Sequence, residues 1–422
     1  MDPINQFIPE GVEDIHSAQY EIKENTIMKM KKIFKAYGYR QILTPTFEYY
    51  DLFSEAEGTI HKDEMFKIID RDGKILVLRP DVTIPIARMV ALNYKDFPGY
   101  LKFSYATNVF RIHDQQNAMK KEFTQTGIEY LGNDKPDSDA EVISLAIECL
   151  KSCGLEDFQI DLGQAGYFKG LMHQVDISPE ERIQIRTFIE NKNFVELAQL
   201  LKHLDLDTDF KNRISEIPYL YGRPEEVMKK ARGYICNEEM EKAIENLNSV
   251  YEILKAYGYE EYLIVDLGLL HHIHYYTGVI FKGYVNHYGK TILSGGRYDQ
   301  LTKHYGSNMP ATGFGLNIDQ LLEAMKLYSV QERFECSTDY LIVYTESTRQ
   351  EAFKLSKKMR EQGWIVETDL LERDMEIHLQ NAIARNIRYI VLLDEEEVKI
   401  FNVKTEECTN TTLLQFEEQL VY

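Results

Sequence analysis

The sequence predicts an α+β protein, in which a mainly antiparallel sheet is flanked by helices and followed by a small C-terminal α/β domain. Strand candidates run through tight turns such as RDGK rather than alternating with long helices. Charged, helix-forming sequence at about 170–256 interrupts the strands and predicts a helical insertion. We therefore expect a core at 1–325, interrupted by that insertion, and a last domain at 333–422. At about 150 residues per domain, the length of the chain likewise predicts two to three domains.

The first elements alternate between helix and strand. Residues 17–37 carry apolar side chains at helical spacing behind Ser17, and Gly38 ends that helix. RQILTPTFEYY (40–50) is rich in β-branched and aromatic residues, and Pro45 favours an edge or an interface. Strands follow at KILVLRP, YLKFSYATNVFRIH and EFTQTGIEYLG, and a helix is expected at 138–152.

The insertion is predicted from segments such as SPEERIQIRTFIENKNFVELAQLLKHL, and strand signals return with YLIVDLG, GVIFKGYV and KTILSGGRYD. The last unit alternates strands YLIVYT, WIVETDLL and RYIVLLD with helices TRQEAFKLSKKMREQG and MEIHLQNAIARN. Alternation of this kind is typical of parallel strands.

The composition argues against several classes of function. The chain has 48 basic and 68 acidic residues, a formal charge of −20, which disfavours a surface built to bind polyanions. No run approaches the ~20 apolar residues that span a bilayer, and the start lacks a basic region before an apolar run, so we expect a cytoplasmic protein without a membrane partner. The five cysteines form no CxxC pair, which argues against a zinc ribbon or a disulfide framework.

Five motifs in order carry a resemblance to histidyl-tRNA synthetases. They are LRPDVTIPIAR (78–88), NVFRIHDQQNAMKKEFTQTGIEYLG (108–132), HHIHYYTG (271–278), SGGRYDQL (294–301) and TGFGLNIDQLL (312–322). The first resembles the LRPE-x-T segment of those enzymes, the second their class II motif 2, the next two their histidine-specific motifs, and the last their motif 3. The resemblance implies a fold like that of class II aminoacyl-tRNA synthetases.

The resemblance also implies a histidine pocket. Such a pocket needs carboxylates for the amino and imidazole nitrogens, an amide, and hydroxyls or aromatic faces that fix the ring. The positions that match are Asp81, Thr83, Gln125, Glu129, Tyr275 and Tyr276, with Arg111 available for the α-carboxylate. Taken singly, each could instead be an exposed or mutually satisfied strand residue. Asp81 stands where the family has Glu, which shortens its reach by a methylene.

The phosphate half of a synthetase site is altered. Where the synthetases read RGLDYYT this chain reads HHIHYYT, so His271 and His274 replace the arginine and the aspartate. In motif 3, Gln320 replaces an arginine and Asn317 a glycine. Adenylation needs cations at the ATP phosphates, and one such contact is worth roughly 3 kcal/mol or more. We therefore expect no aminoacylation, no catalytic residue and no cofactor. The cations left nearby are Arg111, Lys120 and Lys121.

Two further features have weak functional interpretations. His272 and His274 would project from one strand face, but no Cys, Asp or Glu is spaced to complete a metal site, so we expect none. The last domain resembles an anticodon-binding domain, yet residues 333–422 have 11 basic and 18 acidic residues and carry DEEE at 394–397. RNA binding needs positive potential, so we expect a structural or interaction domain and no tRNA partner.

A retained amino-acid pocket without phosphate arginines resembles the synthetase paralogue that serves as regulatory subunit of the short-form ATP phosphoribosyltransferase. That resemblance implies a separate short catalytic subunit as partner in the first step of histidine biosynthesis. It also implies histidine as the feedback effector and a homodimer, formed near Pro45, within a hetero-oligomer. That family is described without an anticodon domain, so residues 333–422 are a departure.

Two alternatives stay open. The chain could be a divergent but active histidyl-tRNA synthetase, which histidine-dependent ATP–pyrophosphate exchange would reveal. It could also be a tRNA or histidine sensor of another kind, in which case specific tRNA binding at physiological salt would be the signature.

Overall fold

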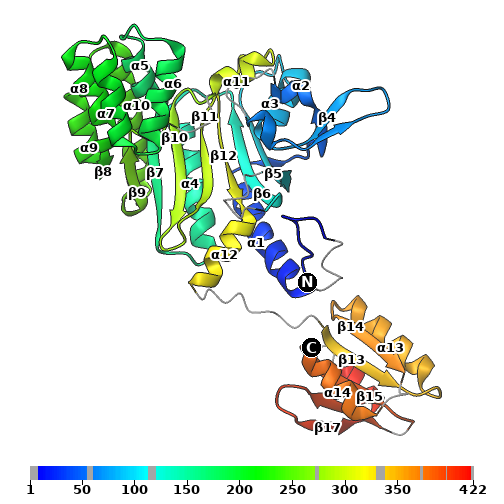
Figure 1. Ribbon diagram of the computed structural model, residues 1–422. Coiled ribbons are helices and arrows are strands. Elements are labelled where there is room, and N and C mark those ends of the chain that lie inside the picture. The colour runs from blue at the N-terminus through cyan, green and yellow to red at the C-terminus, as the bar shows by residue number, and fades with distance from the viewer. Residues whose placement is uncertain are drawn as a thin grey trace. The chain divides into compact units, whose positions relative to one another are not determined.

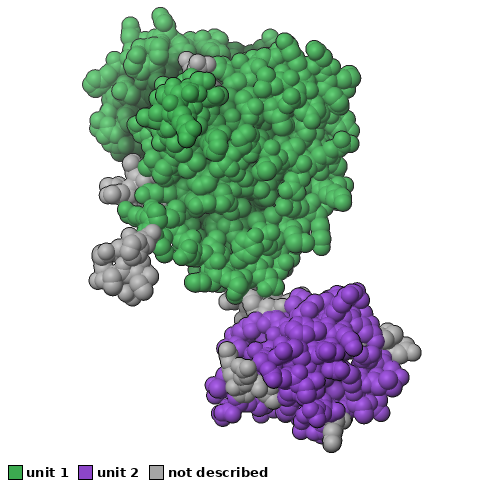
Figure 2. All heavy atoms as spheres, turned by 90° about the vertical axis from the view of Figure 1, so that its right-hand side faces the viewer, with its two compact units in different colours: residues 1–331 green, residues 332–422 purple. Residues whose placement is uncertain are grey.

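The protein is described by a computed structural model that covers residues 8–54, 60–112, 120–270, 275–328, 338–370, 374–395 and 397–419. The chain divides into two compact units, residues 1–331 and 332–422 (Figures 1 and 2), and each is considered by itself. Within the described part of the chain, none of the helices has the long apolar run that a membrane crossing requires.

A nine-stranded sheet forms the centre of the first unit (Figure 1). Its strands, in spatial order, are β1 (Arg40–Gln41), β5 (Leu101–Phe110), β6 (Glu122–Leu131), β12 (Ala311–Asn317), β11 (Thr291–Arg297), β10 (Val279–Val285), β7 (Phe158–Gln164), β9 (Leu263–Asp266) and β8 (Tyr221–Gly222). The β1–β5 and β7–β9 pairs are parallel, and the other neighbouring pairs are antiparallel. The sheet is thus mainly antiparallel, as the sequence predicts.

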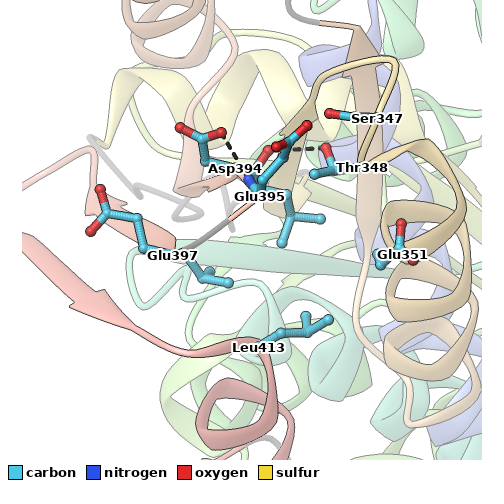
Figure 3. A pocket seen from close by; sticks show the side chains of 9 residues that line it. Ser347, Thr348, Glu351, Asp394, Glu395, Glu397 and Leu413 are labelled. Atoms are coloured by element: carbon cyan, nitrogen blue, oxygen red, sulfur yellow. Dashed lines mark hydrogen bonds between the residues drawn. The ribbon is translucent and has the colours of Figure 1, made fainter.

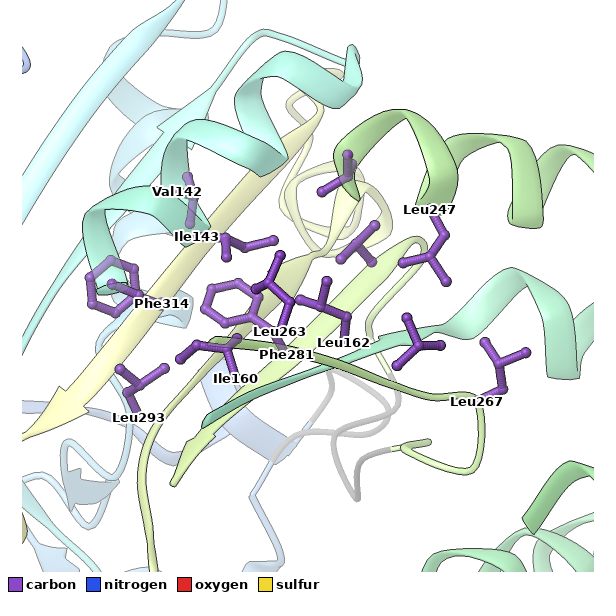
Figure 4. Close-up of a cluster of buried hydrophobic side chains, with 14 of the residues drawn as sticks. Val142, Ile143, Ile160, Leu162, Leu247, Leu263, Leu267, Phe281, Leu293 and Phe314 are labelled. Carbon is purple, nitrogen blue, oxygen red and sulfur yellow. The ribbon is translucent and has the colours of Figure 1, made fainter. Parts of the chain in front are cut away.

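Long helices cover one face of this sheet. They are α1 (Ser17–Ala36), α4 (Pro136–Ser152), α10 (Glu238–Ala256) and α12 (Ile318–Leu327). Figure 4 shows Val142 and Ile143 of α4, with Leu247 of α10, above side chains of the strands. The strand side chains in that cluster include Ile160, Leu162, Phe281, Leu293 and Phe314. This apolar layer is the larger core of the unit, and it fixes the sheet on which the polar residues of the opposite face lie.

The opposite face carries α3 (Thr83–Asn93) and α11 (Asp299–His304), whose apolar residues form a second core with β5. Side chains alternate between the two faces of a strand. In β6, Ile128 and Tyr130 belong to the core with α4, so Gln125, Gly127 and Glu129 point towards the face with α3. The predicted polar positions therefore share one face.

A three-stranded antiparallel sheet of β2 (Phe47–Tyr49), β4 (Ile75–Leu78) and β3 (Lys67–Ile69) forms a separate layer. The predicted extended segment 40–50 is divided between the two sheets, because β1 ends at Gln41 and β2 begins at Phe47 on the other side of Pro45. Short helices α2 (Tyr50–Ser54) and η2 (Lys62–Glu64) accompany the small sheet.

The helical insertion packs at the far edge of the main sheet (Figure 1). Its elements are α5 (Ala165–Met172), α6 (Pro179–Glu190), α7 (Phe194–His203), α8 (Thr208–Glu216), η4 (Ile217–Tyr219), α9 (Pro224–Arg232) and α10, followed by η5 (Glu260–Tyr262). Ser178 and Glu181 form a reciprocal capping box at the start of α6, which explains where this helix begins.

In its described residues, the second unit has a five-stranded sheet and three helices. Its elements are β13 (Thr338–Tyr344), α13 (Arg349–Glu361), β14 (Val366–Leu370), α14 (Met375–Ala384), β15 (Ile387–Leu393), β16 (Val398–Asn402), β17 (Cys408–Thr411) and α15 (Leu413–Gln419). The strands β14, β13 and β15 are parallel, as expected from the alternation of strand and helix. The sheet is nevertheless mixed, because β16 and β17 add antiparallel strands after β15.

Candidate functional site

Glu129 lies at the centre of the candidate site. Its side chain projects from β6 and is 1% exposed. The Thr83 hydroxyl donates to Oε1 at 2.8 Å, and the Tyr298 hydroxyl donates to Oε2. Burial raises the pKa of Glu129 to about 8, although both hydroxyl donors act to lower it. Glu129 is therefore a buried carboxyl group that a cationic ligand would stabilise in its ionised form.

Asp81 supplies a second buried carboxylate just before α3. Its Oδ1 accepts a hydrogen bond from the Ile84 backbone N–H at 3.0 Å, so it also caps the first turn of that helix. Burial raises the pKa of Asp81, while the Arg111 guanidinium and the backbone N–H groups of the turn oppose that rise. Negative charge on Asp81 and Glu129 in turn raises the pKa of Tyr276, after the larger effect of burial. These charge effects place Asp81, Glu129 and Tyr276 around one site.

Arg111 and Gln125 border the same site. The Arg111 Nε donates to the Pro80 carbonyl at 2.7 Å, and its guanidinium lies 5.7 Å from the Phe123 ring centre. A guanidinium held through Nε in this way can present its terminal amino groups to an anionic group such as a carboxylate. The Gln125 Oε1 accepts from the Tyr105 hydroxyl at 3.4 Å, which orients the amide.

Aromatic rings and glycines surround the Glu129 and Gln125 side chains. The Tyr275 and Tyr276 rings are 5.0 Å apart, and Tyr275 meets Tyr298 edge-on at 5.8 Å. A Cβ at Gly313 would lie 2.7 Å from Cδ of Glu129, and one at Gly315 would lie 2.8 Å from Cδ of Gln125. Glycine in β12 is therefore what leaves space for the two polar side chains. The sequence resemblance alone does not reveal that requirement.

The side that would hold phosphates is largely neutralised. The Lys120 Nζ lies 2.5 Å from Glu13 Oε1 and 3.4 Å from Asp319 Oδ1. Asn317, which replaces a glycine of the synthetase pattern, caps α12 by accepting from the Gln320 backbone N–H at 3.1 Å. A lysine already paired with two carboxylates is poorly placed to stabilise the charge of ATP.

The seven predicted pocket residues are all described, whereas His271, His272 and His274 lie outside the described residues. Thr83 and Glu129 are in direct contact, and Gln125 contacts Tyr105. Asp81 and Glu129 are close enough to Tyr276 for their charge to raise its pKa. Tyr298 and Tyr105 were missed by sequence reasoning. Tyr298 belongs to the quoted SGGRYDQL segment, so its motif could have pointed to it, but nothing in the sequence distinguishes Tyr105 from other strand tyrosines.

A pocket with a volume of about 340 Å³ lies in the second unit (Figure 3). Figure 3 shows the carboxylates of Glu351, Asp394, Glu395 and Glu397 around it, with Ser347 and Thr348 beside them. A lining of this charge repels phosphate groups. The pocket gives no support to RNA binding by this domain.

Family comparisons match both units. Residues 11–321 match the family described as histidyl-tRNA synthetase, and residues 338–419 match the anticodon binding domain. The histidyl-tRNA synthetase of Nostoc sp. PCC 7120 has a similar structure, with a TM-score of 0.81 at 18% identity over 98% of both chains. At that identity the likeness concerns the fold alone, and it confirms the predicted class II synthetase-like architecture.

Proteins that are more similar in sequence to this chain are named as regulatory subunits. The ATP phosphoribosyltransferase regulatory subunit of Acetivibrio thermocellus is 40% identical over 409 residues, which cover 96% of this chain and 97% of that protein. The protein of the same name from Clostridium novyi is 36% identical over the whole of both chains. A structure from Bacillus halodurans C, described as an ATP phosphoribosyltransferase regulatory subunit/histidyl-tRNA synthetase, has a TM-score of 0.81 at 34% identity and covers 92% of this chain and 98% of its own.

Proposed function

This chain belongs to the family of ATP phosphoribosyltransferase regulatory subunits, and from that premise we propose that it senses histidine in the pocket around Glu129 and transmits feedback inhibition to a catalytic partner. The predicted regulatory, non-catalytic role in histidine biosynthesis agrees with these relatives. The expectation that such subunits lack an anticodon domain was wrong, because the Clostridium novyi relative matches this chain from end to end. The second unit is part of the family pattern.

The observation that carries the proposal is the contrast between two halves of one site. On one side, Asp81 and Glu129 are buried carboxylates whose burial is unfavourable without a cation. On the other side, Lys120 is paired with Glu13 and Asp319. A zwitterion with a second basic group, such as histidine, suits the first side: its nitrogens meet carboxylates and its own carboxylate meets Arg111.

Feedback requires that histidine binds two arrangements of the complex with different affinity. The catalytic subunit is the short-form ATP phosphoribosyltransferase, which joins ATP to phosphoribosyl pyrophosphate. Assembly with this chain would activate the enzyme, and occupation of the histidine pocket would favour the less active arrangement. A single pocket residue then controls inhibition without touching the catalytic site.

The test is to purify this chain with the short catalytic subunit and to assay the complex with and without histidine. Calorimetry should detect histidine binding to the regulatory chain, and Glu129→Ala should leave an active complex that histidine no longer inhibits. Glu148→Ala is the matched control, because Glu148 also accepts from a tyrosine, Tyr259 at 3.2 Å, but on the opposite face. Full inhibition of the Glu129→Ala complex would refute the assignment.

We also propose a homodimer that uses the small sheet. The strand register places Phe47, Tyr49 and Ile68 on one face with Leu76 and Leu78. The first three are 58%, 52% and 45% exposed. Exposed apolar faces of this kind are typical of protein interfaces. Each chain carries a formal charge of −20. A contact made by the apolar side chains of this face brings less electrostatic repulsion between two such chains than a contact between acidic surfaces would.

A further inference from the structure

The Asp319 carboxylate lies beside the proposed pocket without belonging to it. It projects from the first turn of α12, and its side chain is 9% exposed. Its Oδ2 accepts from the Thr124 backbone N–H at 2.7 Å. The Lys23 Nζ of α1 lies 3.1 Å from Oδ1 and 3.2 Å from Oδ2. One buried carboxylate thus joins α1, β6 and α12.

The partners of Asp319 hold two residues of the pocket. Thr124 precedes Gln125 in β6, one position beyond the last pair between β6 and β12, which is Gln125 with Asn317. Asp319 therefore satisfies a strand N–H where the ladder ends. This contact fixes the backbone from which the Gln125 amide projects.

The second connection runs through Lys120, whose Nζ is 3.4 Å from Asp319 Oδ1. The next residue, Lys121, accepts at its carbonyl from the Arg111 N–H at 2.9 Å and donates its own N–H to the Gly11 carbonyl at 2.7 Å. The N-terminal segment and Asp319 together hold the strand end that carries Arg111.

We propose that Asp319 is a positioning residue that couples α1 to the histidine pocket, by holding the segments from which Gln125 and Arg111 project. The inference rests on the proposed histidine site and deepens it by naming a route for regulation. Helix α1 presents Tyr20 and Met28 to solvent. A displacement of this helix moves Lys23, and through Asp319 it alters the affinity for histidine.

The charge of Lys23 supports this coupling, because a buried carboxylate that loses the nearer of its two cations keeps only Lys120, at 3.4 Å, and must rearrange. Lys23→Met and Asp319→Asn should each weaken histidine binding by roughly tenfold, as expected for residues of one network. For the same reason the double variant should bind no more weakly than either single variant. Asp319→Glu, which keeps the charge, should restore most of the affinity.

The matched control is Lys102→Met. Lys102 pairs with Glu141 of α4 at 2.6 Å, with side chains 15% and 22% exposed. It lies at the start of β5, whereas Arg111 follows the end of that strand. This variant also removes a half-buried ion pair, but its histidine affinity should stay unchanged. Equal weakening by Lys102→Met, or unchanged affinity in Asp319→Asn, would overturn the coupling.

Amide hydrogen exchange separates this inference from the proposed function. Lys23→Met should accelerate exchange in peptides that span 120–131, while the helical insertion stays protected. If the parent chain binds no histidine, the sensing proposal fails. The exchange data then still test whether Asp319 couples α1 to the strand at 120–131. Unchanged exchange at 120–131, or acceleration throughout the first unit, would show that Asp319 does not position this strand.

Discussion

Gly315 and Gln125 occupy adjoining space on the same face of the sheet: a Cβ at Gly315 would lie 2.8 Å from Cδ of Gln125. Gly315→Ala should therefore push the amide out of the pocket and weaken histidine binding by about tenfold, whereas the free energy of unfolding should fall by no more than about 1–3 kcal/mol. Calorimetry with histidine and thermal unfolding measure the two effects.

A double variant tests whether the amide is the cause. Gly315→Ala combined with Gln125→Ala should bind histidine no more weakly than Gln125→Ala alone, because the displaced group is already absent. Additive losses would mean that the methyl group disturbs the pocket in another way.

The pH dependence of histidine binding should follow the protonation of Glu129. Its pKa of about 8 means that the empty pocket holds a proton at neutral pH. A ligand ammonium favours the carboxylate form, so binding releases that proton and the affinity rises with pH between about pH 6 and pH 8, by at most about tenfold per unit. Calorimetry in buffers of different ionisation enthalpy counts the proton released.

The stability of the empty protein should change in the opposite direction. Because the folded pKa of Glu129 is raised above its ordinary value of 4.5, the protonated carboxyl contributes stability that is lost as pH rises from about 4.5 to about 8. Glu129→Gln should remove this loss and the proton release together. A variant that still releases the same proton would assign it to another group, such as Asp81.

Asp81 has two roles that substitution can separate. Asp81→Asn keeps an oxygen that accepts from the Ile84 N–H, 3.0 Å away in the parent protein, but removes the charge. Histidine affinity should therefore fall while the unfolding temperature changes little. Asp81→Ala loses the cap as well and should cost about 1 kcal/mol of stability. Equal destabilisation by the two variants would contradict the capping role.

Sequence reasoning could predict the site where a whole motif lies on one element. Thr83 begins α3, and Gln125 and Glu129 alternate along β6, so motif positions and strand periodicity predict which face they share. The partner of Glu129 could not be predicted in that way, because Tyr298 is 169 residues away and reaches it only through the pairing of β6, β12 and β11. The Lys23–Asp319 pair spans 296 residues and was missed for the same reason.

The proposed dimer gives a prediction at the small sheet. Tyr49→Glu places a charge in the apolar face formed with Phe47 and Ile68, so the mass in sedimentation should fall to that of one chain. Leu92→Glu is the control, because Leu92 is also exposed but lies at the end of α3. Its assembly should not change. Loss of the dimer in Leu92→Glu, or its persistence in Tyr49→Glu, would show that the small sheet does not form the interface.

The altered phosphate half predicts that this chain does not activate histidine. The parent chain should give no histidine-dependent ATP–pyrophosphate exchange, and Gln320→Arg alone should not restore it, since a second arginine is also absent at His271. Each arginine at such a site contributes roughly 3 kcal/mol, a factor of a hundred or more in rate. His271→Arg combined with Gln320→Arg is therefore the variant in which exchange should first become detectable. Added Glu129→Ala should abolish that signal, which ties it to the same pocket. Exchange by the parent chain would instead identify a divergent synthetase and overturn the non-catalytic assignment.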